Sequence, residues 1–361
     1  MSIGGSGGRM VPSRAGSGSR ELVQRALQGL PVSRVPWGPL AVHFCARLAG
    51  CSVRRYSTDA EALTESVLAF YRRFRPDALW VSADTWVSAE AMGTRVGSPS
   101  EDLPLGGVGP PLIRTIRDIE RIPPPDPDTQ GRYPLMREAL SRLQEQVGQE
   151  TFLVGCFDQY PFSLAAALAG LERVMVLAVE DPPFLLALME RCLEYSLAYA
   201  RALRRAGADM LSGGDSPAGL LGPRLYRELA LPFEMRLIRQ LKAEGSGPVS
   251  LHICGNALPI LKDMAGSGAD VLEIDHNVDI AEACRRVGPD VAIWGNLDTV
   301  GVLSQGGPAD VGRAVREALD AVKAAGHPRF VLSSGCTLAW ETPGENLDAA
   351  RQAAGEYPLR E

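Results

Sequence analysis

The chain has 361 residues, 45% of them hydrophobic, which suits one large barrel or two ordinary domains with a sizeable core. Its net charge of −6 argues against a nucleic-acid-binding protein, and its apolar runs are too short to span a bilayer. Seven irregularly spaced cysteines favour reduced thiols or metal ligands over a disulfide framework. We therefore expect a cytoplasmic protein with no membrane or nucleic-acid partner.

The first segment, residues 1–19, is dominated by Gly, Ser and Arg and has no apolar periodicity. This composition is typical of a flexible tail. We expect residues 20–361 to form a single domain behind this N-terminal extension.

Eight short runs rich in Val, Leu and Ile follow the tail, and their hydrophobicity is continuous rather than alternating. They span residues 35–40, 78–82, 152–156, 209–212, 249–253, 271–274, 291–294 and 330–332. Such runs are typical of strands covered on both faces. Helical patterns separate them, as in residues 182–206, where apolar side chains recur at three- and four-residue spacing. Eight strands alternating with helices predict an α/β fold, a closed parallel (β/α)8 TIM barrel.

The second and third expected strands are separated by a long excursion with a proline-rich middle. Because proline interrupts a helix, we expect a segment that passes over the barrel mouth and then a helix over residues 134–147. A lid over the site and an ordinary peripheral insertion both remain open for this segment.

Polar residues gather where the expected strands end, whereas the strand starts are blander. These residues include Asp84, Trp86, Cys156, Asp158, Asp215, His252, Cys254, Asn256, Glu273, Asp275, Asn296, Asp298 and Cys336. Active sites of such barrels lie at the carboxyl ends of the strands. We therefore expect the chemistry at this end.

The sharpest pattern is His252-x-Cys254 on the fifth strand, with Cys336 after the eighth. Residues two apart on a strand point to one face, so His252 and Cys254 can reach one metal. One imidazole and two thiolates make a good zinc set with one open position. The spacing alone leaves a buried core histidine and buried cysteines open as the alternative.

Several stretches resemble the zinc-dependent, corrinoid-linked methyltransferases of the uroporphyrinogen decarboxylase superfamily. They are LHICGN at 251–256, IWGNLD at 293–298 and the segments 116–140, 207–238 and 332–351. The triple of His252, Cys254 and Cys336 is the most specific part of this resemblance. It covers nearly the whole chain after residue 19.

The resemblance implies a barrel, a bound zinc and a methyl group moved between a small substrate and a corrinoid. The substrate would be a thiol, a methoxy compound or another methylated compound. The chain has no D-x-H-x-x-G cobalamin motif, so a separate corrinoid carrier protein is the implied partner. A homodimer is left open as the oligomeric state.

Further residues are candidates for roles around the metal. Glu273 is the candidate for an exchangeable fourth ligand, with a carboxylate hydrogen-bonded to a neighbouring strand end as the alternative. Asp215 and Asp84 are candidate catalytic residues, and Asp215 ranks first because Gly213 and Gly214 precede it. The candidate substrate-binding residues are Trp86, Asn256, Asp275 and Asn296. We expect His43, His276 and His327 to be non-catalytic.

Two other functions compete with methyl transfer. One is uroporphyrinogen decarboxylase, a carboxy-lyase that needs no metal. The arginine-rich N-terminal motif of true decarboxylases is missing, and the expected ring of strand-end residues is largely acidic, which disfavours a substrate with many carboxylates. The other is a non-catalytic barrel that binds a small ligand or a partner.

Overall fold

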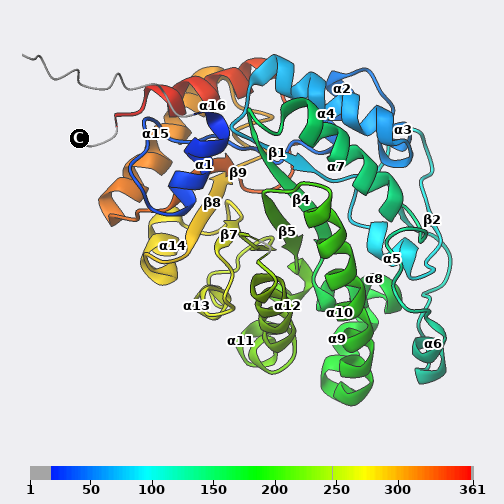
Figure 1. The fold of residues 1–361 in the computed structure, drawn as a ribbon. Helices are drawn as coiled ribbons and strands as arrows, with labels where there is room; N and C mark the ends of the chain where they lie inside the picture. Colours follow the sequence, from blue (N-terminus) through cyan, green and yellow to red (C-terminus); the bar gives the residue numbers. More distant parts are fainter. Residues whose placement is uncertain (1–17, 246, 359–361) are drawn as a thin grey trace, which may run out of the picture.

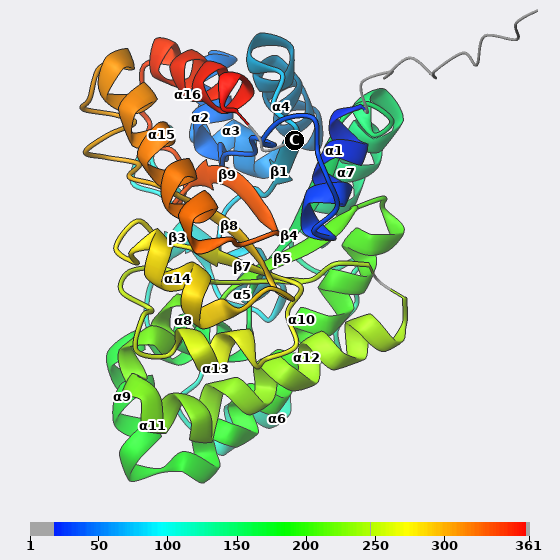
Figure 2. The same ribbon diagram turned by 90° about the vertical axis from the view of Figure 1, so that its left-hand side faces the viewer.

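A computed structural model describes residues 18–245 and 247–358 of the chain. Its centre is a curled, fully parallel seven-stranded sheet in the order β1-β4-β5-β6-β7-β8-β9, surrounded by helices (Figures 1 and 2). The strands are β1 (Ala78–Val81), β4 (Phe152–Gln159), β5 (Met210–Gly214), β6 (Ser250–Ile253), β7 (Val271–Ile274), β8 (Ala292–Leu297) and β9 (Phe330–Ser334). Seven of the eight expected strands are therefore confirmed.

The eighth expected strand, residues 35–40, forms only an isolated bridge between Trp37 and Leu332. The Gly38 N–H donates to the Leu332 carbonyl at 2.9 Å, and the Trp37 carbonyl accepts from the Asp77 N–H at 2.8 Å. The segment is thus bonded to the last strand and to the residue before the first. Because Pro36 has no N–H to donate, the ladder does not extend into a regular strand.

The interior of the curled sheet is a packed core rather than a channel. Inward side chains of the strands, among them Phe152 and Met210, form one buried cluster with α1 (Ser19–Leu27). Trp80 and Trp294 meet edge to face within it, with ring centroids 4.9 Å apart. Ser19 already belongs to this helix, so the expected tail ends earlier than predicted, and residues 1–17 lie outside the described part.

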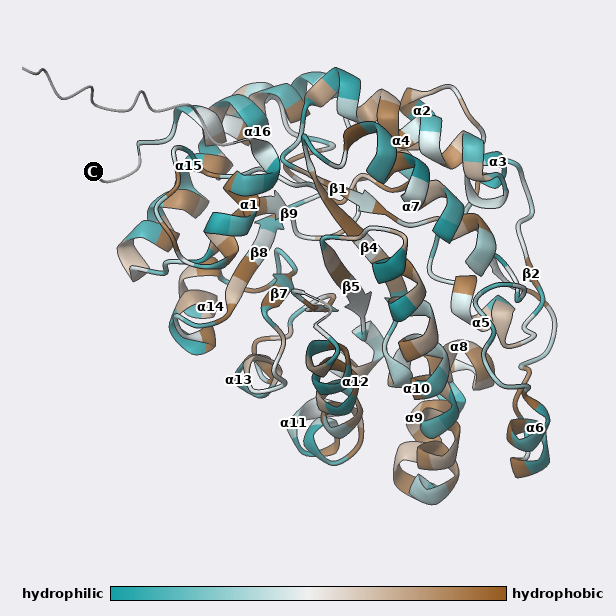
Figure 3. Cartoon of the chain, in the orientation of Figure 1, coloured by the Kyte–Doolittle hydropathy of each residue, from teal (hydrophilic) through white to brown (hydrophobic). Residues whose placement is uncertain are grey.

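Several outer helices carry hydrophobic residues on one side and hydrophilic residues on the other (Figure 3). In α10 (Pro182–Arg205) the expected apolar positions, such as Leu185 and Met189, are fully buried. The Asp181 side chain accepts from the Phe184 N–H at 3.1 Å and caps the start of this helix. The helix predicted over residues 182–206 is confirmed.

The remaining helices lie between successive strands or cover the outside of the sheet. They are α2 (His43–Leu48), α3 (Val53–Thr58), α4 (Ala60–Phe74), α8 (Pro161–Ala169), α9 (Leu171–Glu180), α11 (Gly222–Leu225), α12 (Leu231–Ala243), α13 (Leu261–Ala265), α14 (Ile280–Val287), α15 (Pro308–Ala325) and α16 (Gly344–Glu356), with a 3₁₀ turn at Ser216–Leu221 and a π turn at Tyr226–Ala230. No single helix in the described ranges is long and apolar enough to cross a membrane. The pair α8 and α9 would pass by length and composition together but is bent by 112°.

The excursion between β1 and β4 contains short elements and then a long helix. They are α5 (Val87–Ala91), β2 (Val96–Gly97), β3 (Gly106–Gly107), α6 (Ile116–Arg121) and α7 (Tyr133–Val147). The proline-rich part forms no continuous helix, and the expected helix over residues 134–147 is confirmed as α7. Pro104 and Leu105 of the excursion line the cavity described next, so this segment does reach the mouth of the sheet.

Candidate functional site

A cavity of about 470 Å³ lies at the carboxyl ends of the strands. Six strands, or residues at most two positions beyond their ends, contribute to its wall: Ser82, Cys156, Gly214, His252, Glu273 and Cys336. Parallel strands bring their carboxyl ends to one edge, which explains why residues so far apart in sequence meet here.

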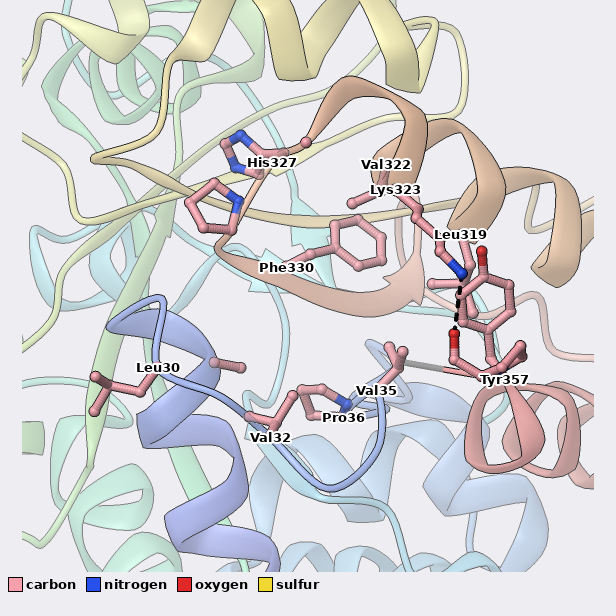
Figure 4. A pocket seen from close by; sticks show the side chains of 14 residues that line it. Leu30, Val32, Val35, Pro36, Leu319, Val322, Lys323, His327, Phe330 and Tyr357 are labelled. Atoms are coloured by element: carbon pink, nitrogen blue, oxygen red, sulfur yellow. Dashed lines mark hydrogen bonds between the residues drawn. The ribbon is translucent and has the colours of Figure 1, made fainter. Parts of the chain in front are cut away.

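A second cavity, of about 270 Å³, lies at the other end of the sheet, between α1, α15 and the start of β9. Its wall is mostly apolar, as the side chains of Leu30, Val32 and Phe330 show in Figure 4. The Lys323 ammonium there donates to the Pro358 carbonyl at 3.3 Å. This cavity lacks the grouped thiols and carboxylates of the first one.

The structure brings His252, Cys254 and Cys336 together on the wall of the larger cavity. The Nε2 atom of His252 lies 2.8 Å from the Cys254 sulfur, and the two sulfurs are 3.5 Å apart. All three ligand atoms lie within 4.8 Å of one another. In the sheet order β7 and β8 separate β6 from β9, so the curl of the sheet makes this meeting possible.

The local chain explains how the two cysteines reach this point. Gly255 has a φ of +78°, which lets the chain turn directly after Cys254. The Cys254 N–H donates to the Ser216 hydroxyl at 3.2 Å. A Cβ at Gly335 would lie 2.6 Å from the His276 backbone nitrogen, so only glycine allows the close approach that places Cys336.

The His252 ring is oriented by the neighbouring strand. Its Nδ1 atom lies 2.9 Å from the Glu273 backbone carbonyl, which accepts the Nδ1 proton and leaves the Nε2 lone pair facing the sulfurs. The Glu273 carboxylate itself accepts from the Ser212 hydroxyl at 2.7 Å and from the Ser250 hydroxyl. Glu273 lines the cavity but is not part of the three-residue ligand cluster.

The three residues lie close enough to shift one another's pKa. Burial lowers the pKa of His252, but the neighbouring Cys336 and the Glu273 charge outweigh it and raise this pKa to about 9. The hydrogen bond with Cys336 lowers the pKa of the Cys254 thiol, whereas the same contact raises the pKa of Cys336 to about 12. One imidazole nitrogen and two sulfurs at this spacing fit zinc.

Asp84 lines the cavity and is held by a buried arginine. Arg132, the residue before α7, donates from Nη2 to the Asp84 carboxylate at 3.1 Å and also pairs with Glu90 on α5. The Trp86 N–H donates to the same carboxylate, at Asp84 Oδ1, at 2.8 Å. Asp84 and Arg132 are both over nine-tenths buried, so the charge pair fixes α7 to the end of β1.

Asp215 does not line the cavity, although the sequence ranks it first among the catalytic candidates. Its carboxylate accepts from the Ser163 N–H of α8 at 2.7 Å and faces Glu234 of α12. Burial raises the pKa of Asp215 to about 6, and the pKa of Glu234 rises well above its usual value. Asp215 therefore connects the end of β5 to α8 and faces α12.

The candidate substrate-binding residues also lie outside the cavity wall. Asp275 accepts from the Gly255 N–H at 3.0 Å and so supports the turn after Cys254. Asn296 donates to the Val278 carbonyl at 2.8 Å, and the exposed Asn256 accepts from the Leu258 N–H at 3.2 Å. Trp86 packs beside Gly107, where a Cβ would lie 2.6 Å from its ring. In the structure these four residues hold loops in place.

Other cavity residues carry no site prediction. His43 lines the wall, and its Nε2 atom lies 2.8 Å from the Ala83 carbonyl, while burial lowers its pKa. Asp158, Gln159 and Ser163, from the end of β4 and the start of α8, also line it. Of these three residues only Asp158 carried a signal in the sequence, because it lies two residues after the expected strand over residues 152–156.

Known proteins resemble this chain along most of its length. The family model for uroporphyrinogen decarboxylase (URO-D) matches residues 18–357. A methylcobamide:CoM methyltransferase MtbA of Methanosarcina acetivorans is 30% identical over 344 residues, 94% of this chain and 98% of that protein. A uroporphyrinogen decarboxylase of Crocosphaera subtropica is also 30% identical, over 82% of each chain.

Comparison with solved structures also finds a methyltransferase that is similar along most of the chain. A methyltransferase from Methanosarcina mazei superimposes with a TM-score of 0.85 at 25% identity, covering 94% of this chain and 98% of the other. The relatives therefore include both named methyltransferases and named decarboxylases at the same level of identity. With the family model matched over nearly its whole length, the chain belongs to the uroporphyrinogen decarboxylase family.

Proposed function

We propose that this protein is a zinc-dependent methyltransferase that moves a methyl group between a small substrate and a corrinoid held by a separate carrier protein. The observation that carries the proposal is the meeting of His252, Cys254 and Cys336 on the wall of the strand-end cavity. We also propose that residues 35–40, bonded at both edges of the curled sheet, complete an eight-stranded barrel.

In this proposal His252, Cys254 and Cys336 hold the zinc, with Glu273 as an exchangeable fourth ligand. A bound zinc would supply Lewis acidity, favouring the thiolate form of a thiol substrate or stabilising the leaving oxygen of a methoxy compound. The Glu273 carbonyl holds the His252 tautomer, and the Asp275 carboxylate holds the turn after Cys254. These contacts keep the ligand atoms in place before substrate arrives.

The remaining candidate residues are proposed to orient the substrate or to support the elements around the cavity. We propose that Asp84, on the cavity wall, orients the substrate and that Arg132 holds its carboxylate fixed. Asp215 is proposed to support β5, because its carboxylate faces α8 and α12. Asn256, Asn296 and Trp86 are proposed to shape the loops around the mouth rather than touch the substrate.

Uroporphyrinogen decarboxylase is the second candidate, because a relative with that name shares 30% identity with the chain, the same value as the MtbA methyltransferase. Its substrate carries several carboxylates, which need positive partners when they leave water. Within the described ranges, however, no Lys or Arg side chain lines the cavity, whereas Asp84, Asp158 and Glu273 do. The charge of the cavity wall therefore favours the methyltransferase over the decarboxylase. The grouping of three possible metal ligands argues against a non-catalytic barrel.

The reduced state of the thiols also bears on the proposal. All seven cysteines are free, and two of them are the proposed sulfur ligands. A reducing compartment keeps such thiols available for metal, so we propose a cytoplasmic protein.

Methyl transfer can be tested directly with free methylcobalamin in place of the carrier protein. Zinc-loaded enzyme is mixed with methylcobalamin and a thiol, and demethylation is followed by visible absorption. The proposal predicts turnover above a zinc-free sample of the same protein. Uroporphyrinogen consumption without methylcobalamin turnover would favour the decarboxylase instead.

A further inference from the structure

His43 places a hydrogen-bond acceptor on the wall of the strand-end cavity, apart from the proposed metal ligands. Its Nε2 atom lies 2.8 Å from the Ala83 carbonyl, which can only accept, so the proton of the neutral ring is on Nε2 and the lone pair is on Nδ1. Within the described ranges Nδ1 makes no hydrogen bond, and it does not belong to the unpartnered polar atoms that are closed off from solvent. Because His43 lines the cavity, this lone pair is open to a ligand there.

The imidazole is held neutral by its surroundings. Burial lowers the pKa of His43, and the Ala83 carbonyl and the Asp84 charge offset this only in part. The Asp84 carboxylate is itself paired with Arg132. The ring of Tyr56 packs edge to face against the imidazole, with ring centroids 5.8 Å apart. A neutral imidazole whose Nε2 proton is already donated can accept a hydrogen bond from the cavity but can donate none to it.

The backbone in front of His43 is strained. Val42 has a φ of +34°, a positive value that a β-branched residue rarely adopts. The nearby Leu40 is bonded on two sides, since its N–H donates to the Ser334 hydroxyl at 3.0 Å and its carbonyl accepts from the Leu338 N–H at 2.8 Å. Strain of this kind persists only where the surrounding structure holds it, and it is concentrated at ligand-binding and active sites. The strained turn therefore points to a role for the side chain that it places on the wall.

The wall around His43 is apolar and offers no positive charge. Leu40, Val42 and Leu105 line the same cavity, and no Lys or Arg does so in the described part of the chain. A carboxylate or sulfonate beside this imidazole would meet a lone pair instead of a proton, with no cation to compensate for its lost hydration. A hydroxyl or an amide N–H supplies the proton that the Nδ1 atom can accept.

His43 and the proposed metal ligands are close enough for one small molecule to touch both. The two partners of Leu40, Ser334 and Leu338, lie on either side of Cys336 in the sequence. His43 and Cys336 line one cavity of about 470 Å³, and a compact cavity of this volume is about 10 Å across. A molecule whose sulfur lies at the metal site therefore needs only a short chain to reach the imidazole.

We propose that His43 is a substrate-binding residue, whose Nδ1 atom accepts a hydrogen bond from an uncharged hydroxyl or N–H group at the far end of a thiol substrate. This inference rests on the proposed zinc methyltransferase function and names the substrate class of that site. It agrees with the expectation that His43 is not catalytic, because the imidazole holds the substrate without exchanging a proton with it.

Two series of thiols test the proposal on the full-length protein loaded with cobalt(II) in place of zinc. Mercaptoalkanols, HS–(CH2)n–OH, are compared with alkanethiols, HS–(CH2)n–CH3, for n from two to six, so that each pair differs only in its terminal group. Visible absorption of cobalt reports thiolate binding at the metal and gives a dissociation constant for each. At the chain length that reaches His43, we expect the mercaptoalkanol to bind about five-fold more tightly than its alkanethiol, as one net hydrogen bond allows. At the other lengths the alkanethiol should bind more tightly, because a hydroxyl without a partner is costly to bury.

Variants at His43 locate the acceptor. His43→Phe keeps a ring but removes Nδ1, so the preference for the mercaptoalkanol should be lost while the alkanethiols still bind. His43→Asn keeps an acceptor oxygen near the position of Nδ1 and should retain the preference. Thr337→Val removes a hydroxyl from the same cavity wall and is the control, which should also retain it. Circular dichroism and cobalt content show that each variant is folded and loaded.

The outcomes separate the two proposals. If no thiol changes the cobalt spectrum, the zinc function fails and the substrate contact of His43 fails with it. If the thiols bind but no mercaptoalkanol is preferred at any chain length, the metal site stands and the role of His43 is wrong. A preference that survives in His43→Phe, or that is lost in Thr337→Val, would also overturn it.

Discussion

At the scale of single residues, a few buried polar contacts fix the side chains around the site. Asp84 and Arg132 show this most clearly, because both are over nine-tenths buried and carry opposite charges. Arg132 also bonds the Ser57 carbonyl at 3.0 Å and pairs with Glu90. Three segments of the chain therefore depend on one guanidinium.

Replacing this arginine should be costly. In Arg132→Met the Asp84 carboxylate remains buried without its partner, and we expect a loss of about 3–5 kcal/mol in the free energy of unfolding. Denaturant unfolding measures it. Arg142→Met, which removes an exposed pair with Glu138, is the control and should change stability by less than about 0.5 kcal/mol. Equal effects of both substitutions would show that the buried pair is not a support of the site.

Cys254 tests the ligand set. Cys254→Ser leaves His252 and Cys336, too few protein ligands for a tight zinc site, so the variant should lose most of its zinc and its methyl transfer. Its circular dichroism should match that of the wild type, because the sheet core supplies the burial. Cys51→Ser, at a cysteine away from the site, should keep both zinc and activity. A Cys254→Ser protein with full zinc would remove this residue from the ligand set.

The sequence allowed part of this site to be predicted. His252 and Cys254 could be placed on one face because strands alternate with a period of two, and Cys336 because parallel strands end at one edge. The direction of Asp215 could not be predicted, since it depends on how α8 and α12 pack. Gln159 and Ser163 were missed because their place on the cavity wall depends on how α8 packs at the end of β4.

At the scale of elements, close approaches between segments decide where the sheet edges meet. Gly38 lies against Trp294 of β8, whose indole N–H donates to the Gly38 carbonyl at 2.9 Å. The strand expected over residues 35–40 is wrong as a regular strand, because its prolyl nitrogen cannot join a ladder. The apolar run nevertheless predicted that residues 35–40 would lie beside the other strands of the sheet.

A side chain at Gly38 should loosen this junction. The Cβ of Gly38→Ala would lie 2.8 Å from the Trp294 ring and 3.1 Å from the Ala78 side chain. We expect a destabilisation of about 1–3 kcal/mol from this overpacking, measured by thermal unfolding. Gly355→Ala in α16, where a Cβ meets nothing within 4 Å, is the control. It should stabilise by up to about 1 kcal/mol. A neutral Gly38→Ala would mean that the junction is loosely packed.

The buried carboxyl pair of α12 and β5 predicts a pH dependence of stability. The folded pKa of Glu234 is raised by burial and by Asp215, so its contribution is fully present below the unfolded pKa and is lost as pH rises. Glu234→Gln should therefore lose less stability between pH 5 and pH 8 than the wild type, by about 1 kcal/mol or more, in urea titrations at both values. Glu228→Gln, at an exposed position, should follow the wild type. A Glu234→Gln protein with the wild-type slope would contradict the raised pKa.

At the scale of the whole molecule, the two ends of the sheet differ in character. At one end α1 packs against the strands, and an apolar cavity lies beside α15. The other end carries the thiols, carboxylates and hydroxyls of the larger cavity. The proposed zinc ligands lie at the edge of a core that is complete without them. The fold and the metal site should therefore be separable.

Metal content of the wild-type protein is the measurement that tests the central claim most directly. The protein is purified without a metal-binding tag and analysed by plasma mass spectrometry beside its circular dichroism spectrum. A three-ligand site of one histidine and two cysteines predicts about one zinc per chain. A well-folded preparation that contains no metal, and takes up none when zinc is added, would contradict the account and favour a metal-independent decarboxylase.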